Sequence, residues 1–163
     1  MKPIPPIRVG LCGEFEAGKS LLLNCLLGQR VALVGDLFPT TRFAVIYQWG
    51  QQSSVELFRS DETVACEFPS LEEFLNFLRS ERATDSGKRR LEQFVEARVA
   101  LNLQALQRTT LVDTPGIDAS ENDESRAYAV IKTLDFAVVV LTNYSRLNEK
   151  GCSASRFSGR KAS

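Results

Sequence analysis

The octapeptide GEFEAGKS at residues 13–20 limits the possible folds of this chain more than any other segment. It fits the pattern G-x-x-x-x-G-K-[ST], in which a glycine-rich loop connects a strand to a helix. Gly13 and Gly18 let the backbone pass close to an anion, where a Cβ atom would clash. Successive backbone N–H groups, continued by the N-terminus of the helix, then attract phosphate oxygens. The octapeptide therefore predicts a phosphate-binding loop in an α/β fold.

The segments on either side of the loop have the pattern that the motif requires. Residues 7–12, IRVGLC, have the apolar character of a short buried strand, and apolar residues recur at helical spacing after the loop. Gly28 is a suitable stop for that helix. We therefore expect a strand over 7–12 and a helix over about 18–27. Lys19 is expected to bring a positive charge to the outer phosphates, and the Ser20 hydroxyl to ligate Mg²⁺.

The sequence LVDTPG at residues 111–116 supplies a second part of the same candidate site. Its apolar start reads as a strand that carries Asp113 at its end, before a Pro-Gly turn. Ligands of open α/β sheets lie at the carboxyl ends of strands, so Asp113 is placed to hold Mg²⁺ directly or through water. The N–H of Gly116 has no side chain to keep a γ-phosphate away. An ordinary turn would have the same six letters, but beside the glycine-rich loop they favour a nucleotide and Mg²⁺ site.

The composition is that of an ordinary soluble domain and excludes several classes of function. The chain has 163 residues, 44% hydrophobic and 25% charged, so we expect one domain with a substantial core. A formal net charge of zero gives no argument for a nucleic-acid partner or for attraction to an anionic membrane. The four scattered cysteines are typical of reduced thiols in a cytoplasmic protein, and the lack of histidine excludes histidine-based catalysis. We expect neither a signal peptide nor a membrane span.

Between the two motifs, the pattern predicts three strands and a charged helical region. The strands are expected over 44–49, 55–58 and 63–68. Their short turns indicate an antiparallel meander. Ser70 and Glu73 form a capping box that opens a helix with one apolar face. The charged residues at 79–98 are balanced in sign and predict a solvated helix face.

Beyond that region, the pattern predicts two further strands, a helix and a tail. Apolar residues alternate over 99–103, as in a strand, before the strand that ends at Asp113. Ser120 and the acidic residues after it are expected to cap a helix that runs to about Lys132. The apolar run at 136–141 predicts a final buried strand. Residues 151–163 are small, polar and basic, and we expect them to be disordered.

The loop octapeptide, the LNCLLG at 23–28 and the FPTTR at 38–42 together resemble the start of a bacterial dynamin-like GTPase. One hundred positions separate Gly13 from Asp113, far more than a minimal Ras-like GTPase needs. The excess lies between the two motifs, where dynamin-type domains carry additional structure. The resemblance covers about residues 7–150. It implies a P-loop NTPase fold, a three-layer α/β sandwich with a mixed, mostly parallel sheet, incomplete at its C-terminal end.

Carried over position by position, the resemblance implies a GTP site with bound Mg²⁺. The nucleotide-binding residues would be Gly13, Glu16, Ala17, Gly18, Lys19, Ser20, Asp113 and Gly116. The Mg²⁺ ligands would be Ser20, Thr41 and Asp113. The catalytic residues would be Lys19, Ser20 and Thr41, with Thr40 as the alternative to Thr41. Ile117 stands where Ras-like enzymes have a water-orienting glutamine, which dynamin-type enzymes also lack. In the family, dimerisation across the nucleotide helps to complete the site, so a homodimer is expected.

Two departures from the family pattern limit what the resemblance implies. Glu16 places a carboxylate where the family has a small polar residue, which is unfavourable near phosphates unless the side chain points away or pairs with a cation. The last expected strand ends in LTNYSR at 141–146, which supplies neither the Lys nor the Asp of the guanine-reading motif [NT]-K-x-D. We therefore expect residues 1–150 to be the N-terminal portion of a dynamin-type G domain that lacks this motif.

Three functions are compatible with these residues. The leading hypothesis is Mg²⁺-dependent GTP hydrolysis that, in a full-length protein, is linked to self-association and to membrane remodelling through segments outside this chain. Such a protein would be cytoplasmic or peripheral to a membrane. The alternative is a truncated fragment that keeps the phosphate contacts but lacks guanine selectivity and turnover. A P-loop ATPase or kinase is the third, which the threonines at 40–41 and the motif at 111–116 disfavour.

Overall fold

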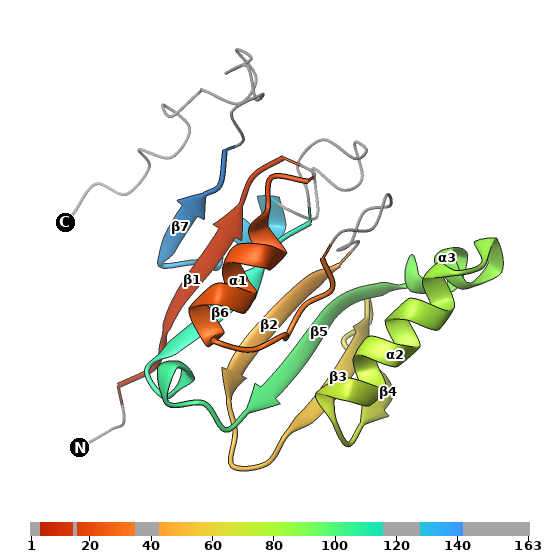
Figure 1. The fold of residues 1–163 in the computed structure, drawn as a ribbon, viewed down its shortest axis with the longest axis horizontal. Helices are drawn as coiled ribbons and strands as arrows, with labels where there is room; N and C mark the ends of the chain where they lie inside the picture. The colour runs from red at the N-terminus through yellow and green to blue at the C-terminus, as the bar shows by residue number, and fades with distance from the viewer. Residues whose placement is uncertain (1–3, 15, 35–42, 116–127, 142–163) are drawn as a thin grey trace.

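A mixed β-sheet forms the centre of the molecule (Figure 1). The structure, a computed structural model, describes residues 4–14, 16–34, 43–115 and 128–141. Within these residues the strands are β1 (Ile7–Cys12), β2 (Ala44–Trp49), β3 (Ser54–Arg59), β4 (Val64–Phe68), β5 (Phe94–Leu101), β6 (Thr109–Asp113) and β7 (Phe136–Val139). Their order across the seven-stranded sheet is β4-β3-β5-β2-β6-β1-β7.

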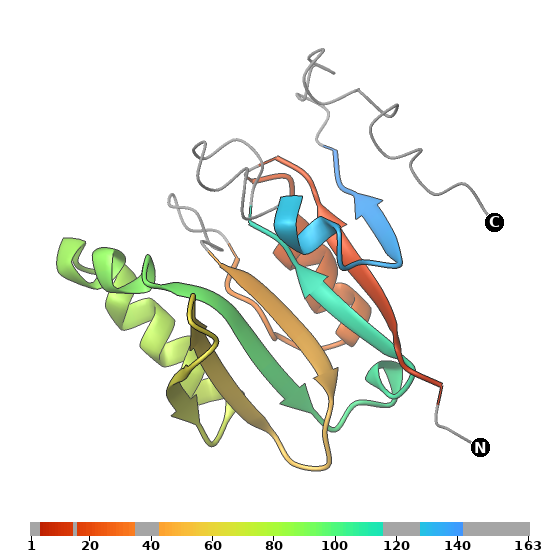
Figure 2. The ribbon, with the colours of Figure 1, turned by 180° about the vertical axis from the view of Figure 1, so that it is seen from behind.

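Helices cover both faces of this sheet. On one face lie α1 (Lys19–Leu27) and α2 (Leu71–Arg82), and α3 (Asp85–Leu91) follows α2 (Figure 1). The helical segment at 128–131 lies on the opposite face (Figure 2). The expected three-layer α/β sandwich with a mixed sheet is confirmed, but the sheet is not mostly parallel, since three of the six pairings between described strands are antiparallel. In the described part of the chain, no helix combines the length and the apolar character that crossing a membrane requires.

Strand β2 shows how the sheet is buried on both sides. Its residues alternate between the faces, as the pleat requires. Val45 and Tyr47 belong to the larger core, under α1 and α2. Ala44 and Ile46 belong to a smaller core on the opposite face, where Val130 packs against them. Burial on both faces explains why β2 is a continuous apolar run rather than an alternating one.

The expected antiparallel meander of three strands is wrong, because β5 lies between β2 and β3. Strand β5 pairs in parallel with β2, from Ala44 opposite Glu96 to Trp49 opposite Leu101. It pairs antiparallel with β3, so β2 and β3 are consecutive in sequence but not adjacent in the sheet. Only the β3–β4 pair keeps the expected antiparallel arrangement. Short turns between strands are therefore an incomplete guide to which strands pair.

Strand β5 also begins earlier than the alternating pattern predicts. It starts at Phe94, which is buried, whereas charged residues had suggested a solvated helix over the same stretch. Two of these charges are accommodated within the strand: Arg98 donates from Nε to Glu96 Oε1 at 2.6 Å and lies 4.2 Å from the centre of the Phe58 ring. The ion pair lies within β5 and the contact with the Phe58 ring joins β5 to β3, and together they give the Arg98 charge partners in the sheet.

The capping box that opens α2 is confirmed. The Ser70 hydroxyl accepts a hydrogen bond from the Glu73 N–H at 3.2 Å, which satisfies one of the free N–H groups of the first turn. The buried face of α2 carries Phe74, Leu75 and Leu78. Helix α2 thus lies on the sheet through one apolar stripe, and its C-terminal end reaches the same edge of the sheet as the glycine-rich loop (Figure 1).

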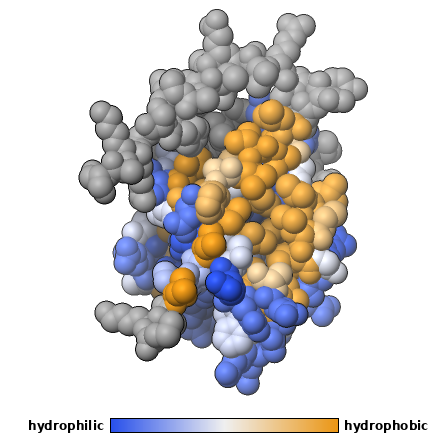
Figure 3. Space-filling view, turned by 90° about the vertical axis from the view of Figure 1, so that its left-hand side faces the viewer, coloured by the Kyte–Doolittle hydropathy of each residue, from blue (hydrophilic) through white to orange (hydrophobic). Residues whose placement is uncertain are grey.

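The expectation that residues 136–141 form a buried strand is wrong in one respect. Strand β7 spans Phe136–Val139, and all four of its residues are exposed, Phe136 at 63% and Val139 at 59%. The reason is its place in the sheet: among the residues that the structure describes, β7 pairs with β1 alone, at the end of the strand order. Figure 3 shows apolar side chains gathered over this side of the molecule. The expected helix start at Ser120 and the expected tail at 151–163 lie outside the described residues.

Candidate functional site

The glycine-rich loop connects β1 to α1, as expected, and its glycines have backbone angles that other residues rarely adopt. Gly13 has a φ of +150°, and a Cβ atom there would overlap the carbonyl oxygen of Val140. Gly18, immediately before α1, has a φ of +92°. Both conformations favour glycine, because an L side chain is strained at such angles. The described residues of the motif therefore form a tight turn in which glycine is required at Gly13 both by its φ and by the nearby Val140 carbonyl.

Lys19 extends back over this loop from the first turn of α1. Its Nζ donates to the carbonyl oxygens of Gly13, at 3.1 Å, and Glu14, at 2.8 Å. The residue is only 7% exposed. A lysine charge is strongly hydrated in water, so holding it in a buried position requires oxygen partners such as these carbonyls. The loop thus holds a cation in the position where the motif predicts contact with outer phosphates.

Ser20 and Asp113 are brought together although 93 positions separate them. The Ser20 Oγ donates to Asp113 Oδ2 at 2.9 Å, and Asp113 is 2% exposed. Parallel pairing of β1 with β6, with Leu11 opposite Asp113, places the end of β6 beside the start of the loop. A hydroxyl and a carboxylate at this spacing form an oxygen donor set of the kind that Mg²⁺ prefers. The two residues fit a Mg²⁺ site.

Thr114 joins the end of β6 to β1 through a hydrogen bond, which the sequence motif alone did not predict. Its hydroxyl donates to the Leu11 carbonyl oxygen at 2.8 Å, and the residue is fully buried. The thiol of Cys12 lies beside it. Burial raises the pKa of Cys12, and this outweighs the opposing effects of the Thr114 hydrogen bond and the Lys19 charge. The thiol therefore stays protonated and acts as a packing group.

Glu16, the unusual residue of the loop, lies exposed with a φ of +59°. Its side chain is therefore in contact with solvent, which reduces the cost of a carboxylate beside phosphates. Ala17, next to it, is 8% exposed and packs inside the loop. Thr40, Thr41, Gly116 and Ile117 lie outside the described residues. Of the expected site, the structure thus describes the loop, Lys19, Ser20 and Asp113.

Asn24 fixes the segment that leads out of α1 toward residue 34. Its Oδ1 accepts hydrogen bonds from the backbone N–H groups of Val31 and Ala32, at 2.8 and 2.9 Å. Its Nδ2 donates to the Ala32 carbonyl oxygen at 3.0 Å. One side chain therefore satisfies three backbone groups of an irregular segment. The residue stands in the LNCLLG segment, but its role depends on contacts that only the fold reveals.

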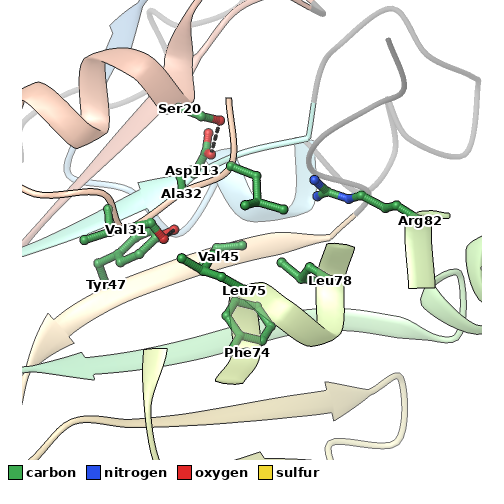
Figure 4. A pocket seen from close by; sticks show the side chains of 11 residues that line it. Ser20, Val31, Ala32, Val45, Tyr47, Phe74, Leu75, Leu78, Arg82 and Asp113 are labelled. Atoms are coloured by element: carbon green, nitrogen blue, oxygen red, sulfur yellow. Dashed lines mark hydrogen bonds between the residues drawn. The ribbon is translucent and has the colours of Figure 1, made fainter. Parts of the chain in front are cut away.

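A small cavity of about 20 Å³, enough for one water molecule, lies between α2, β2 and the segment that Asn24 holds. Ser20 and Asp113 line one part of it, and Arg82, the last residue of α2, lines another (Figure 4). The wall contributed by α2 is otherwise apolar, formed by Phe74, Leu75 and Leu78. Sequence reasoning missed Arg82, because it stands in a charged stretch with no distinguishing pattern.

Tyr47 lines the same cavity from β2. Its hydroxyl donates to the Val31 carbonyl oxygen at 3.2 Å, and the residue is 2% exposed. Burial raises the pKa of Tyr47 well above its usual value near 10, and the negative charge of Asp113 raises it further. Tyr47 therefore remains a neutral hydrogen-bond donor throughout the neutral and mildly alkaline range.

The raised pKa of Tyr47 predicts a loss of stability at high pH. The unfolded chain releases the tyrosine proton above pH 10, whereas the folded chain retains it. The free energy of unfolding should therefore fall as pH rises above 10, by up to about 1.4 kcal/mol per pH unit. Tyr47→Phe should remove this part of the pH dependence and cost about 1 kcal/mol at pH 7 through the lost hydrogen bond. Urea denaturation of both proteins from pH 8 to 11 measures the difference, and parallel pH profiles would contradict it.

The loop, the helix that follows it and the carboxylate at the end of β6 define the class of this molecule. It has the fold of the P-loop NTPases. The sequence profile of the dynamin family matches residues 9–153, most of the chain. The chain therefore belongs to the dynamin family, a family of GTPases.

Individual relatives are distant and much longer. Dynamin-like protein 2 of Campylobacter jejuni is 24% identical over 132 residues, which are 81% of this chain and 20% of that protein. Two solved chains of an oligomerised bacterial dynamin pair, described as a mechanism for long-range sensing and tethering of membranes, superpose with TM-scores of 0.57 and 0.58. Each is 23% identical and covers 83% of this chain and 20% of its own length. This chain thus spans about a fifth of the proteins it matches.

Proposed function

We propose that this domain binds GTP together with Mg²⁺ and hydrolyses it. The observation that carries the proposal is the hydrogen bond between Ser20 and Asp113 beside the loop that holds Lys19. It joins the two halves of a phosphate and metal site from distant parts of the chain. Membership of the dynamin family supports GTP as the nucleotide.

In this proposal, the described residues have separate roles in binding the nucleotide and the metal. On nucleotide binding, Lys19 exchanges its loop carbonyl partners for the outer phosphate oxygens, which are stronger acceptors because they are charged. The backbone N–H groups of the loop, from Glu16 to Ser20, would surround the phosphates, and the open space beside Gly18 leaves room for them. Ser20 and Asp113 would hold Mg²⁺, which would supply positive charge beside the transferring phosphoryl group.

Two residues outside the described part of the chain complete the proposed site. Thr41, with Thr40 as its alternative, would contribute a hydroxyl to Mg²⁺ and to the attacking water. The Gly116 N–H meets the γ-phosphate. Ile117 cannot orient water as a glutamine does, so turnover depends on groups supplied in another way, and a second copy of the chain across the nucleotide is the proposed source.

In a longer protein, we propose that the nucleotide cycle drives self-association at a membrane surface. The support is that the bacterial dynamin pair is described as oligomerised and as tethering membranes. The protein would then be cytoplasmic and peripheral to the membrane. Light scattering after size exclusion tests the dimer: mass should double with a non-hydrolysable GTP analogue, and an unchanged monomer in every nucleotide state would refute it.

A second candidate function is phosphate binding without guanine selectivity or turnover. It is favoured by the segment after β7, LTNYSR, which contains neither the lysine nor the aspartate that reads guanine in most GTPases. This candidate makes the same phosphate contacts but predicts equal affinity for GTP and ATP.

Fluorescent GTP and ATP titrations, with and without Mg²⁺, separate these functions. Our proposal predicts at least about 10-fold tighter binding of GTP than of ATP, about 1.4 kcal/mol, and weaker binding of GTP when Mg²⁺ is removed. Phosphate release should be measurable with GTP. Equal binding of both nucleotides without phosphate release would support the second candidate, and preference for ATP would identify a P-loop ATPase.

A further inference from the structure

The C-terminal end of α2 places a cationic side chain beside the candidate Mg²⁺ site. Arg82 is the last residue of α2 and lines the cavity that Ser20 and Asp113 also line. Figure 4 shows its guanidinium directed from the end of the helix toward this cavity. The residue is half-buried, whereas Arg79, one turn earlier on the same helix, is exposed and bonds to Asn76 at 2.6 Å. The two arginines of α2 thus face different surroundings.

The topology of the sheet explains why the end of α2 lies at this edge. Strand β5 follows α3 and pairs with the start of β2, Ala44 opposite Glu96. The start of β2 lies beside the end of β6, Val45 opposite Asp113. The chain that leaves α2 must therefore reach the edge of the sheet where Asp113 ends its strand.

An ion pair between the buried Glu81 and the exposed Arg90 restrains the backbone next to Arg82. Glu81 is 9% exposed, and its carboxylate accepts two hydrogen bonds from Arg90 of α3, at 2.7 and 3.0 Å. Gly87 packs directly against the backbone of Glu81, where a Cβ atom would overlap it. Bidentate pairing and close packing both restrict the turn from α2 to α3. The direction in which Arg82 leaves the helix is therefore set by the fold.

The surroundings of Arg82 favour an anionic partner with oxygen atoms. Phe74, Leu75 and Leu78 form an apolar wall on the α2 side of the cavity. Electrostatic attraction is stronger beside such a wall than in water. The planar guanidinium matches the spacing of phosphate oxygens and stays charged at any pH that the protein tolerates. A phosphate is thus the ligand chemistry that the position suits.

The place of the cavity indicates which phosphate is within reach. In a P-loop site, the loop surrounds the inner phosphates, and Ser20 and Asp113 would hold a Mg²⁺ ion that supplies positive charge to the outer ones. The terminal phosphate is therefore the one that lies on the Ser20 and Asp113 side, toward the cavity. We propose that Arg82 binds the terminal phosphate of the nucleoside triphosphate and makes the site prefer GTP over GDP. This inference rests on the proposed function of the same site.

Substitution of the two α2 arginines tests this inference. Affinities for a fluorescent non-hydrolysable GTP analogue and for fluorescent GDP are measured with Mg²⁺ for the wild-type chain, Arg82→Gln and Arg79→Gln. Arg82→Gln should weaken binding of the triphosphate analogue about 10-fold or more and that of GDP less than about 3-fold. Arg79→Gln removes the same charge from the exposed side of the helix and should change neither affinity. Arg82→Lys keeps the charge but loses the planar guanidinium, so its affinity for the triphosphate analogue should fall between those of the wild type and Arg82→Gln.

The outcomes separate this inference from the proposed function. Equal weakening of triphosphate and diphosphate by Arg82→Gln, or weakening of neither, overturns the role of Arg82 and leaves the GTP site intact. A wild-type chain that binds neither nucleotide overturns the proposed function, and the inference with it. If thermal unfolding shows that Arg82→Gln does not fold, the test is the ratio of the triphosphate affinity to the GDP affinity in Arg82→Lys. A ratio equal to that of the wild type refutes recognition by the Arg82 guanidinium.

Discussion

Replacing Lys19 with alanine should weaken binding of GTP by at least about 100-fold. Lys19 is 7% exposed, and its ammonium group is held in the loop by two carbonyl oxygens. Phosphate oxygens would replace these acceptors, and each hydrogen bond between charged groups contributes about 1.5–3 kcal/mol in such surroundings. Two such bonds account for the expected loss, since 1.4 kcal/mol corresponds to a factor of 10. Fluorescence titration with a GTP analogue and Mg²⁺ measures it.

The matched control is Lys132→Ala, which removes an exposed lysine after the helical segment at 128–131. It should leave the affinity within about 2-fold of wild type, because exposed charges contribute little. Lys19→Ala should also lower the free energy of unfolding by about 1–2 kcal/mol, since the Gly13 and Glu14 carbonyls lose their donor. A Lys19→Ala protein that is folded and binds GTP as tightly as the Lys132→Ala protein would contradict the proposed site.

Local sequence patterns predicted the loop and its flanking elements well. Both β1 and β2 have the expected bounds, and α1 begins one residue after the expected start. The reason is that these features depend on neighbours in sequence: a glycine with positive φ, a run of apolar residues, a capping serine at position 70. The pairing of Ser20 with Asp113 was also predictable, because parallel strands of a P-loop fold end at one edge.

Features that depend on distant parts of the chain were not predictable in the same way. The insertion of β5 between β2 and β3 is set by long-range pairing. The charges of Glu96 and Arg98 made this strand resemble part of a charged helix in the sequence. The exposure of β7 depends on its place at the end of the strand order. The position of Arg82 depends on where α2 ends relative to β6, which no local pattern encodes.

Helix α2 therefore links the core to the candidate site, and Phe74 is a large, buried side chain of its core-facing side. Its side chain is 1% exposed and packs against Phe68 with ring centres 5.6 Å apart. It also lines the cavity that Ser20 and Asp113 share. The position of Arg82 at that cavity thus depends on packing two turns earlier in the helix.

Phe74→Ala should lower the free energy of unfolding by about 3–5 kcal/mol, because it leaves a cavity under α2 as well as losing buried apolar area. For a chain of this length, the melting temperature should fall by about 10 °C. Phe136→Ala is the control, since it makes the same change at a side chain that is 63% exposed, and it should alter the free energy of unfolding by no more than about 0.5 kcal/mol. Urea denaturation of both variants measures the difference. Equal losses would mean that α2 does not pack on the sheet as described, and the approach of Arg82 to the phosphate site would lose its structural basis.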